Sequence, residues 1–111
     1  MKELQEAALS FARLNLPGKD GQTRKQALES VERQTGHRDP DLDSVHVPQD
    51  CQQIWQEYFR LRRGRAIEWR DVADYQTVTG VQFSSFEVDA IFAMDSGVEE
   101  AIAEAAKRKE K

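Results

Sequence analysis

The sequence predicts an all-α fold, a small helical domain of about five helices with a compact core from the last three. Apolar residues recur at helical spacing in successive segments, and glycine or proline separates these segments. No segment of useful length has the two-residue period of a strand. Hydrophobic residues make up 39% of the chain and charged residues 32%, which is typical of a small soluble helical protein.

The first two helices are expected within residues 1–36. Residues 2–15 carry the helical period and Pro17 ends it, while Thr23 and Gln26 form a capping box for a second, short helix. Gly36 supplies a left-handed stop. The side chains expected to face inward are Leu4, Ala7, Ala8, Phe11 and Leu14, then Ala27, Leu28 and Val31.

Residues 37–47 have no helical period and are predicted to be an acidic, irregular linker. Pro48 suits the first turn of a third helix, which Gly64 ends. A fourth helix is expected over about 68–78, with Gly80 as its stop. The expected buried faces are Cys51, Ile54, Trp55, Tyr58 and Leu61, then Trp69, Val72, Tyr75 and Val78. Cys51 is expected to be a buried structural thiol.

The last helix has the clearest start, since Ser84 and Glu87 form a second capping box. Gly97 is expected to weaken it by about 1 kcal/mol relative to alanine. Its predicted apolar stripe is Phe86, Val88, Ile91, Met94, Val98, Ile102 and Ala105. The predicted division of the chain is an N-terminal helical pair (1–36), the linker (37–47), and a helical core domain with a C-terminal helical arm (48–111).

Charge is distributed unevenly along the chain. Residues 60–70 hold five arginines and one glutamate, whereas residues 71–106 hold eight acids and no lysine or arginine. The arginines are open to three interpretations: a solvated or paired face, a protein-binding patch, or a nucleic-acid patch with stacking aromatics. The first is favoured, because the nearby aromatics are expected to lie in the core.

Asp95 lies on the apolar stripe of the last helix, where a carboxylate must be paired or hydrogen-bonded. An arginine of the 60–65 turn, or the N-terminal end of another helix, is the simplest partner. No second carboxylate, histidine or nucleophile is spaced to work with Asp95, so the sequence does not predict an enzyme.

Three segments resemble ligand-binding motifs but lack the residues or the spacing that those motifs need. No metal or other cofactor is therefore expected. A calcium loop beginning at Asp39 would have Ser44 where the sharp turn needs glycine. His37, His46 and Cys51 lack the paired spacing of a zinc site. Residues 17–23 lack the Gly-Lys-Ser/Thr ending of a phosphate loop. The chain also has no apolar run long enough for a membrane span and no signal peptide.

Residues 54–95 contain three short amphipathic segments, IWQEYFRLRRGR, EWRDVADYQTVTG and VQFSSFEVDAIFAMD. This stretch resembles the tail assembly chaperones of long-tailed phages and prophages, with Phe86 where that family often has tryptophan. The matching positions are Trp55, Tyr58, Phe59, Arg63, Gly64, Thr79, Gly80, Phe86, Glu87, Val88, Ile91, Met94 and Asp95.

The resemblance implies a non-catalytic helper that binds the tape-measure protein and recruits tail-tube subunits. Such a helper acts in the bacterial cytoplasm and is absent from the mature virion; membrane and nucleic acid are not expected partners, and self-association is a further option. The alternative is a small DNA-binding regulator of a phage operon. Its recognition helix would begin at Ser84 and carry acids without arginine, lysine or asparagine for base edges.

The partner surface is predicted from the charge split and from the end of the last helix. A terminal helix that extends past the core is expected to leave Val98, Ile102 and Ala105 exposed. Charged residues around such an apolar contact favour fast, salt-sensitive association. The candidate partner-binding residues are Arg60, Arg62, Arg63, Arg65, Val98 and Ile102.

Overall fold

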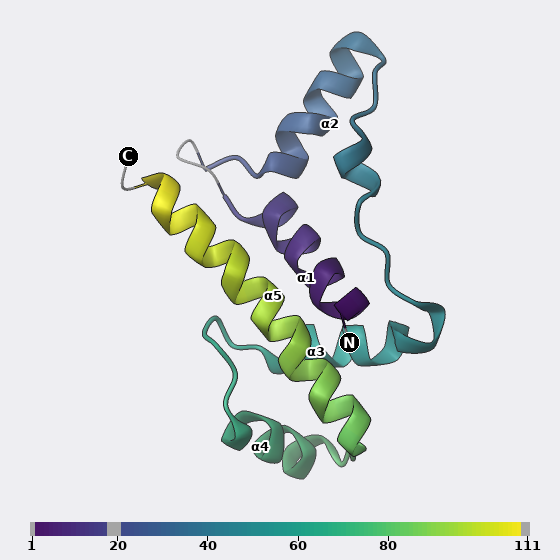
Figure 1. Cartoon of the computed structure of the whole chain (residues 1–111), viewed down its shortest axis with the longest axis vertical. Coiled ribbons are helices and arrows are strands. Elements are labelled where there is room, and N and C mark those ends of the chain that lie inside the picture. Colours follow the sequence, from purple (N-terminus) through teal and green to yellow (C-terminus); the bar gives the residue numbers. More distant parts are fainter. Residues whose placement is uncertain (1, 18–20, 110–111) are drawn as a thin grey trace.

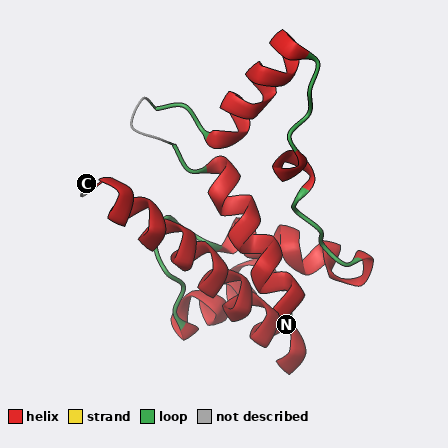
Figure 2. Ribbon diagram, turned by 45° about the horizontal axis from the view of Figure 1, so that its top comes forward, coloured by secondary structure: helices red, strands yellow, loops and turns green. Residues whose placement is uncertain are grey.

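The computed structural model of the chain describes residues 2–17 and 21–109 (Figure 1). Within these ranges the chain forms helices joined by loops, with no β-strand (Figure 2), so the all-α prediction is confirmed. The elements are α1 (Lys2–Asn15), α2 (Arg24–Thr35), the 3₁₀ turns η1 (Pro40–Asp43) and η2 (Gln49–Cys51), α3 (Gln52–Leu61), α4 (Trp69–Thr79) and α5 (Ser85–Lys109).

Local hydrogen bonds set the helix ends where the sequence predicts them. At the start of α2 the Gln26 amide donates to Thr23 Oγ1 at 3.1 Å, and the Thr23 amide donates to Gln26 Oε1 at 2.9 Å. The same reciprocal pair joins Ser84 and Glu87 at the start of α5, at 3.2 and 3.0 Å. Both capping boxes are therefore confirmed.

The glycine stops and the linker follow from backbone conformation. Gly36 and Gly80 adopt φ of +75° and +76° at the ends of α2 and α4, which confirms these two predicted stops. The predicted stop at Gly64 is wrong, because α3 ends at Leu61 and Arg62 is already extended. The linker is less irregular than expected, because Asp39 caps η1 through its side chain. α3 begins one turn later than predicted, since η2 follows Pro48 and carries the buried Cys51.

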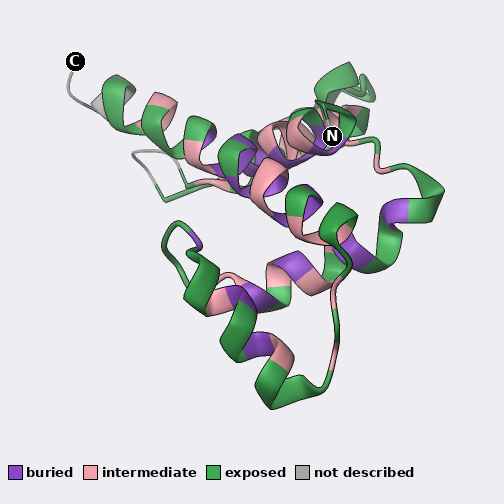
Figure 3. Cartoon of the chain, turned by 60° about the horizontal axis from the view of Figure 1, so that its bottom comes forward, coloured by how far each residue is buried: buried purple, intermediate pink, exposed green. Residues whose placement is uncertain are grey.

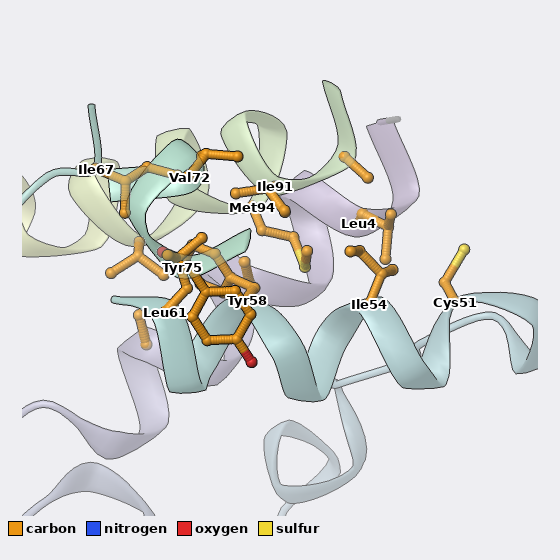
Figure 4. Packing of buried hydrophobic residues seen from close by; sticks show 14 of the residues in the cluster. Leu4, Cys51, Ile54, Tyr58, Leu61, Ile67, Val72, Tyr75, Ile91 and Met94 are labelled. Carbon is orange, nitrogen blue, oxygen red and sulfur yellow. The ribbon is translucent and has the colours of Figure 1, made fainter. Parts of the chain in front are cut away.

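The core lies between α3 and α5, and Figure 4 shows side chains of these helices and of the α4 region meeting there. Tyr58, Ile91 and Met94 are the largest fully buried side chains. The predicted contribution of the last three helices is thus confirmed. α1 adds to the same cluster through Leu4, Ala8 and Ala12.

α1 runs beside α5 in the same direction, and this pair makes the most extensive helix contact in the described chain (Figure 1). Gly97 lies where the two backbones approach most closely. A Cβ added there would collide with the Gln5 carbonyl oxygen and lie 3.0 Å from the Leu9 amide nitrogen. The expectation that Gly97 is a weak point is therefore wrong, because its missing side chain lets α1 reach α5.

The expected buried faces of α2 and α3 are wrong in part. α2 has no buried residue; Ala27 is exposed and Val31 is 47% exposed, because α2 contacts mainly α1 and η1. In α3, Ile54 is buried as predicted, but Trp55 is only partly buried. Its ring lies at the edge of the core, 5.7 Å from the ring of Phe11.

The division at the 37–47 linker stays a prediction. The two helices of the N-terminal pair differ in their packing. α1 contributes residues to the core cluster, whereas α2 has no buried residue and lies away from the core (Figure 1).

We expect Gly97→Ala to lower the free energy of unfolding by about 1–3 kcal/mol, the usual cost of overpacking. Alanine would favour the helix by about 1 kcal/mol in isolation, but the colliding atoms belong to the α1 backbone and cannot rotate away. Urea unfolding followed by far-UV circular dichroism measures the change. Ser96→Ala, on the exposed side of the same turn, is the control and should be nearly neutral. A more stable Gly97→Ala protein would contradict the close approach.

Candidate functional site

The predicted basic turn connects α3 to α4 and contains four arginines with different surroundings. We call residues 60–66 the arginine turn. Gly64 bends it with φ of +80°, a conformation that costs glycine little. Arg60, Arg63 and Arg65 are exposed, whereas the Arg62 side chain is 11% exposed and turns toward α5.

Arg62 reaches Asp95, the one charged residue among the buried side chains of the described residues. Its guanidinium pairs with Asp95 Oδ1 and also donates to Glu99 Oε2 at 3.1 Å. The expected pairing of Asp95 with an arginine of the turn is therefore confirmed.

Asp95 accepts two further hydrogen bonds from other parts of the fold. The Tyr58 hydroxyl of α3 donates to Oδ1 at 2.7 Å, and the Ile67 amide, just before α4, donates to Oδ2 at 3.0 Å. The carboxylate thus joins α3, the arginine turn and the entry of α4 to α5. Burial, then the bond to Asp95, raises the pKa of the Tyr58 hydroxyl above its ordinary value.

The exposed arginines form a surface at the start of α4. Arg65 donates to Asp71 Oδ1 at 2.8 Å, while Arg60 lies 3.8 Å from Glu57. The Glu68 amide, followed by Arg65 and Arg63, lowers the pKa of the Asp71 carboxyl. Arg63 has no ion pair with any described residue.

A shallow groove of about 250 Å³ opens between α1, α3 and α5 beside this turn. Its walls are mostly apolar, with Phe11 and Leu16 on one side and Phe59 on another. The remaining lining residues are Ala12, Asn15, Arg62, Gly64 and Val98. The fold therefore brings two of the predicted partner-binding residues, Arg62 and Val98, to one groove.

The expectation that Val98 is an exposed apolar residue is wrong. Val98 is 6% exposed, because α1 covers this part of α5 as far as the Arg13–Glu104 ion pair of 2.7 Å. Ile102, one turn beyond Val98, is 37% exposed as expected, and Ala105 is only half-exposed. Beyond Ala101 the side chains of α5 are exposed or half-exposed as far as Lys107, and Figure 3 shows the C-terminal end of this helix mostly uncovered.

Three large apolar side chains that were expected in the core are exposed. Trp69 is 70% exposed, Val78 83% and Phe86 59%. α4 is buried only along the line of Val72 and Tyr75, and Trp69 and Val78 lie on opposite sides of that line. Helical spacing alone could not reveal how narrow the covered strip would be.

Two further findings concern other kinds of site. Among the described residues, no three histidine, cysteine, aspartate or glutamate side chains are grouped to hold a metal ion. No described helix combines the length and apolar character needed to cross a membrane.

The comparisons with known proteins give one match. A model of the phage tail assembly chaperone family matches residues 31–100. The matched range contains α3, the arginine turn, α4 and the Asp95 region of α5, whereas α1 lies outside it. No curated protein and no solved structure matches the chain.

We expect Asp95→Asn to lower the free energy of unfolding by about 3–5 kcal/mol, because Arg62 would keep a buried charge without its main partner. Chemical denaturation measures this loss. Glu99→Gln removes only the outer carboxylate bonded to Arg62. Because the Glu99 side chain is 39% exposed, this change should cost less than about 1 kcal/mol. Equal losses in the two variants would contradict the central role of Asp95.

Stability should also fall in alkali through Tyr58. Its folded-state pKa is raised, so the stabilisation is complete below the unfolded value of about 10 and is lost as pH rises through the folded value. Tyr58→Phe should lower the Tm at about pH 8 and flatten the decline toward about pH 11. Some decline should remain, because the pKa of Tyr75 is raised as well. Identical alkaline slopes for both proteins would exclude Tyr58 as a source.

Proposed function

This chain belongs to the phage tail assembly chaperone family, and from that membership we propose that it binds a phage tape-measure protein and recruits tail-tube subunits during tail assembly. The observation that carries the proposal is the family match over residues 31–100. Membership in a chaperone family favours a non-catalytic role. We infer that the protein acts in the bacterial cytoplasm and is absent from the mature virion.

The proposed partner surface consists of the exposed arginines and the uncovered end of α5. Arg60, Arg63 and Arg65 lie on the arginine turn, and Ile102 is the partly exposed apolar residue on α5. Such a charged surface speeds encounter with a partner of opposite charge and makes the association sensitive to salt. Arg62 and Val98 are left out of the proposed surface, because both side chains are largely buried.

The DNA-binding alternative gains no support from the geometry. The first turns of α5 would have to face the DNA, and they present the exposed Asp89 and the capping carboxylate of Glu87. Phosphate would be repelled by both carboxylates.

Co-expression with the tape-measure protein tests the function. We expect the wild-type chain to keep that protein soluble and to co-purify with it. Arg60→Glu with Arg63→Glu should weaken capture, because two exposed cations of the proposed surface are reversed. Lys25→Glu with Arg33→Glu, on exposed positions of α2, changes the net charge equally and should have no effect.

Two results would count against the proposal. A tape-measure protein that stays insoluble beside the wild-type chain would contradict the function itself. Equal losses in the two double variants would show that total charge matters rather than the arginine turn.

A further inference from the structure

α2 and η1 form an arm that stands away from the core (Figure 1). We call residues 24–43 the α2–η1 arm. No described apolar residue between Gly21 and His46 belongs to the core cluster or packs against it. Within α2, which has no buried residue, Leu28 is half-buried and Val31 is 47% exposed. Burial of apolar surface therefore contributes little to holding the arm in place.

Charged side chains fasten the two parts of the arm to each other. Arg38 lies in the loop between α2 and η1 and reaches both of them. Its guanidinium donates to Glu32 Oε2 of α2 at 3.0 Å, and it makes a bidentate pair with Asp43 of η1 at 2.8 and 3.0 Å. Arg24, the first residue of α2, pairs with Asp41 of η1. Ion pairs thus connect both ends of α2 to η1.

These ion pairs are exposed, which limits the stability that they give. The side chains of Arg38 and Arg24 are 50% and 49% exposed. Exposed pairs contribute little and are screened by salt, because water solvates both charges. A helix of 12 residues is also marginal where tertiary packing is slight. A segment with so few buried contacts opens at a lower free-energy cost than the core.

We propose that Arg38 is an electrostatic latch, and that α2 detaches from η1 and opens while the core stays folded. In the closed state Arg38 holds the end of α2 beside η1. When its ion pairs are screened or removed, α2 loses its main fastening to η1, and its backbone amides become open to exchange with water. The core stays intact, because no described apolar side chain of the arm packs against it. The latch operates in the free chain and is independent of the tape-measure protein.

Hydrogen–deuterium exchange of the full chain, followed by mass spectrometry, tests the latch. We expect the amides of α2 to exchange faster than those of α5 around the buried Ile91 and Met94. Raising the salt concentration from about 0.01 M to about 1 M shortens the Debye length from about 30 Å to about 3 Å. The protection of α2 relative to α5 should then fall about two- to fivefold, because the ion pairs of the arm are screened.

Arg38→Gln removes the latch, and Lys25→Gln is the matched control. Arg38 lies outside α2, so its replacement leaves the residues of that helix unchanged. We expect Arg38→Gln to lower the protection of α2 in low salt and to reduce its dependence on salt. Lys25 is exposed on α2 and makes no ion pair with a described residue. Its replacement removes the same charge and should not lower the protection of α2.

Each of four results would overturn the proposal. Protection of α2 that responds neither to salt nor to Arg38→Gln would remove the latch, and protection equal to that of α5 would place α2 within the cooperative core. Equal losses in Arg38→Gln and Lys25→Gln would assign the effect to total charge. A parallel loss of protection in α5 would show unfolding of the whole chain instead of a local opening.

Discussion

A single buried carboxylate holds together the helices of the part that matches the family model. Asp95 accepts bonds from Tyr58 in α3, Arg62 in the arginine turn and Ile67 before α4. A buried charge is costly unless its partners are complete, and here three donors from separate segments complete it. The position of the arginine turn against α5 therefore depends on this carboxylate, and so does the direction in which the remaining arginines point.

The contact of Arg62 with Asp95 also explains why the arginines of the turn differ from one another. Arg62 neutralises Asp95 inside the fold, so its charge is not available at the surface. Arg60, Arg63 and Arg65 remain outside and give the turn its basic character. One arginine thus has a structural role, whereas its neighbours keep their charges at the surface, where Arg65 pairs with Asp71.

The residues that match the family model are not all of the residues that form the core. The matched residues 31–100 include most of the apolar face of α5, yet α1, which lies before residue 31, covers a large part of that face. Ala8 is fully buried there, and Gly97 provides the space for the α1 backbone. The part of the chain that defines the family therefore relies on a segment outside it to complete the core.

Sequence reasoning succeeded where neighbouring residues determine the structure. The capping pairs Thr23–Gln26 and Ser84–Glu87 define helix starts through bonds three residues apart, and such bonds follow from local order. The pairing of Asp95 was also predictable, because a carboxylate on an apolar stripe requires a cation and the arginine turn held the nearest supply. The family resemblance added the function class, which no local pattern of residues contains.

Prediction failed where the result depends on which helix covers which face. Periodicity indicates the apolar side of a helix, but not how much of it another element reaches. Trp69 and Val78 therefore lie outside the narrow strip of α4 that is covered, whereas Val98 lies inside the wide contact of α5 with α1. Helix propensity alone predicts that Gly97 weakens α5. The structure shows that it leaves room for α1, whose contacting residues lie more than eighty positions earlier in the chain. The partner surface itself stays a prediction.

The contact of α1 with α5 also bears on how the protein folds. Gln5 and Gly97 lie far apart in the sequence, so their contact raises the contact order of the fold. α1 is synthesised before α5, so its apolar face finds its partner only after α5 has emerged. Until then Leu4, Ala8 and Ala12 lack part of the core cluster that buries them in the finished fold. The nascent chain therefore passes through a stage in which the apolar face of α1 is still exposed.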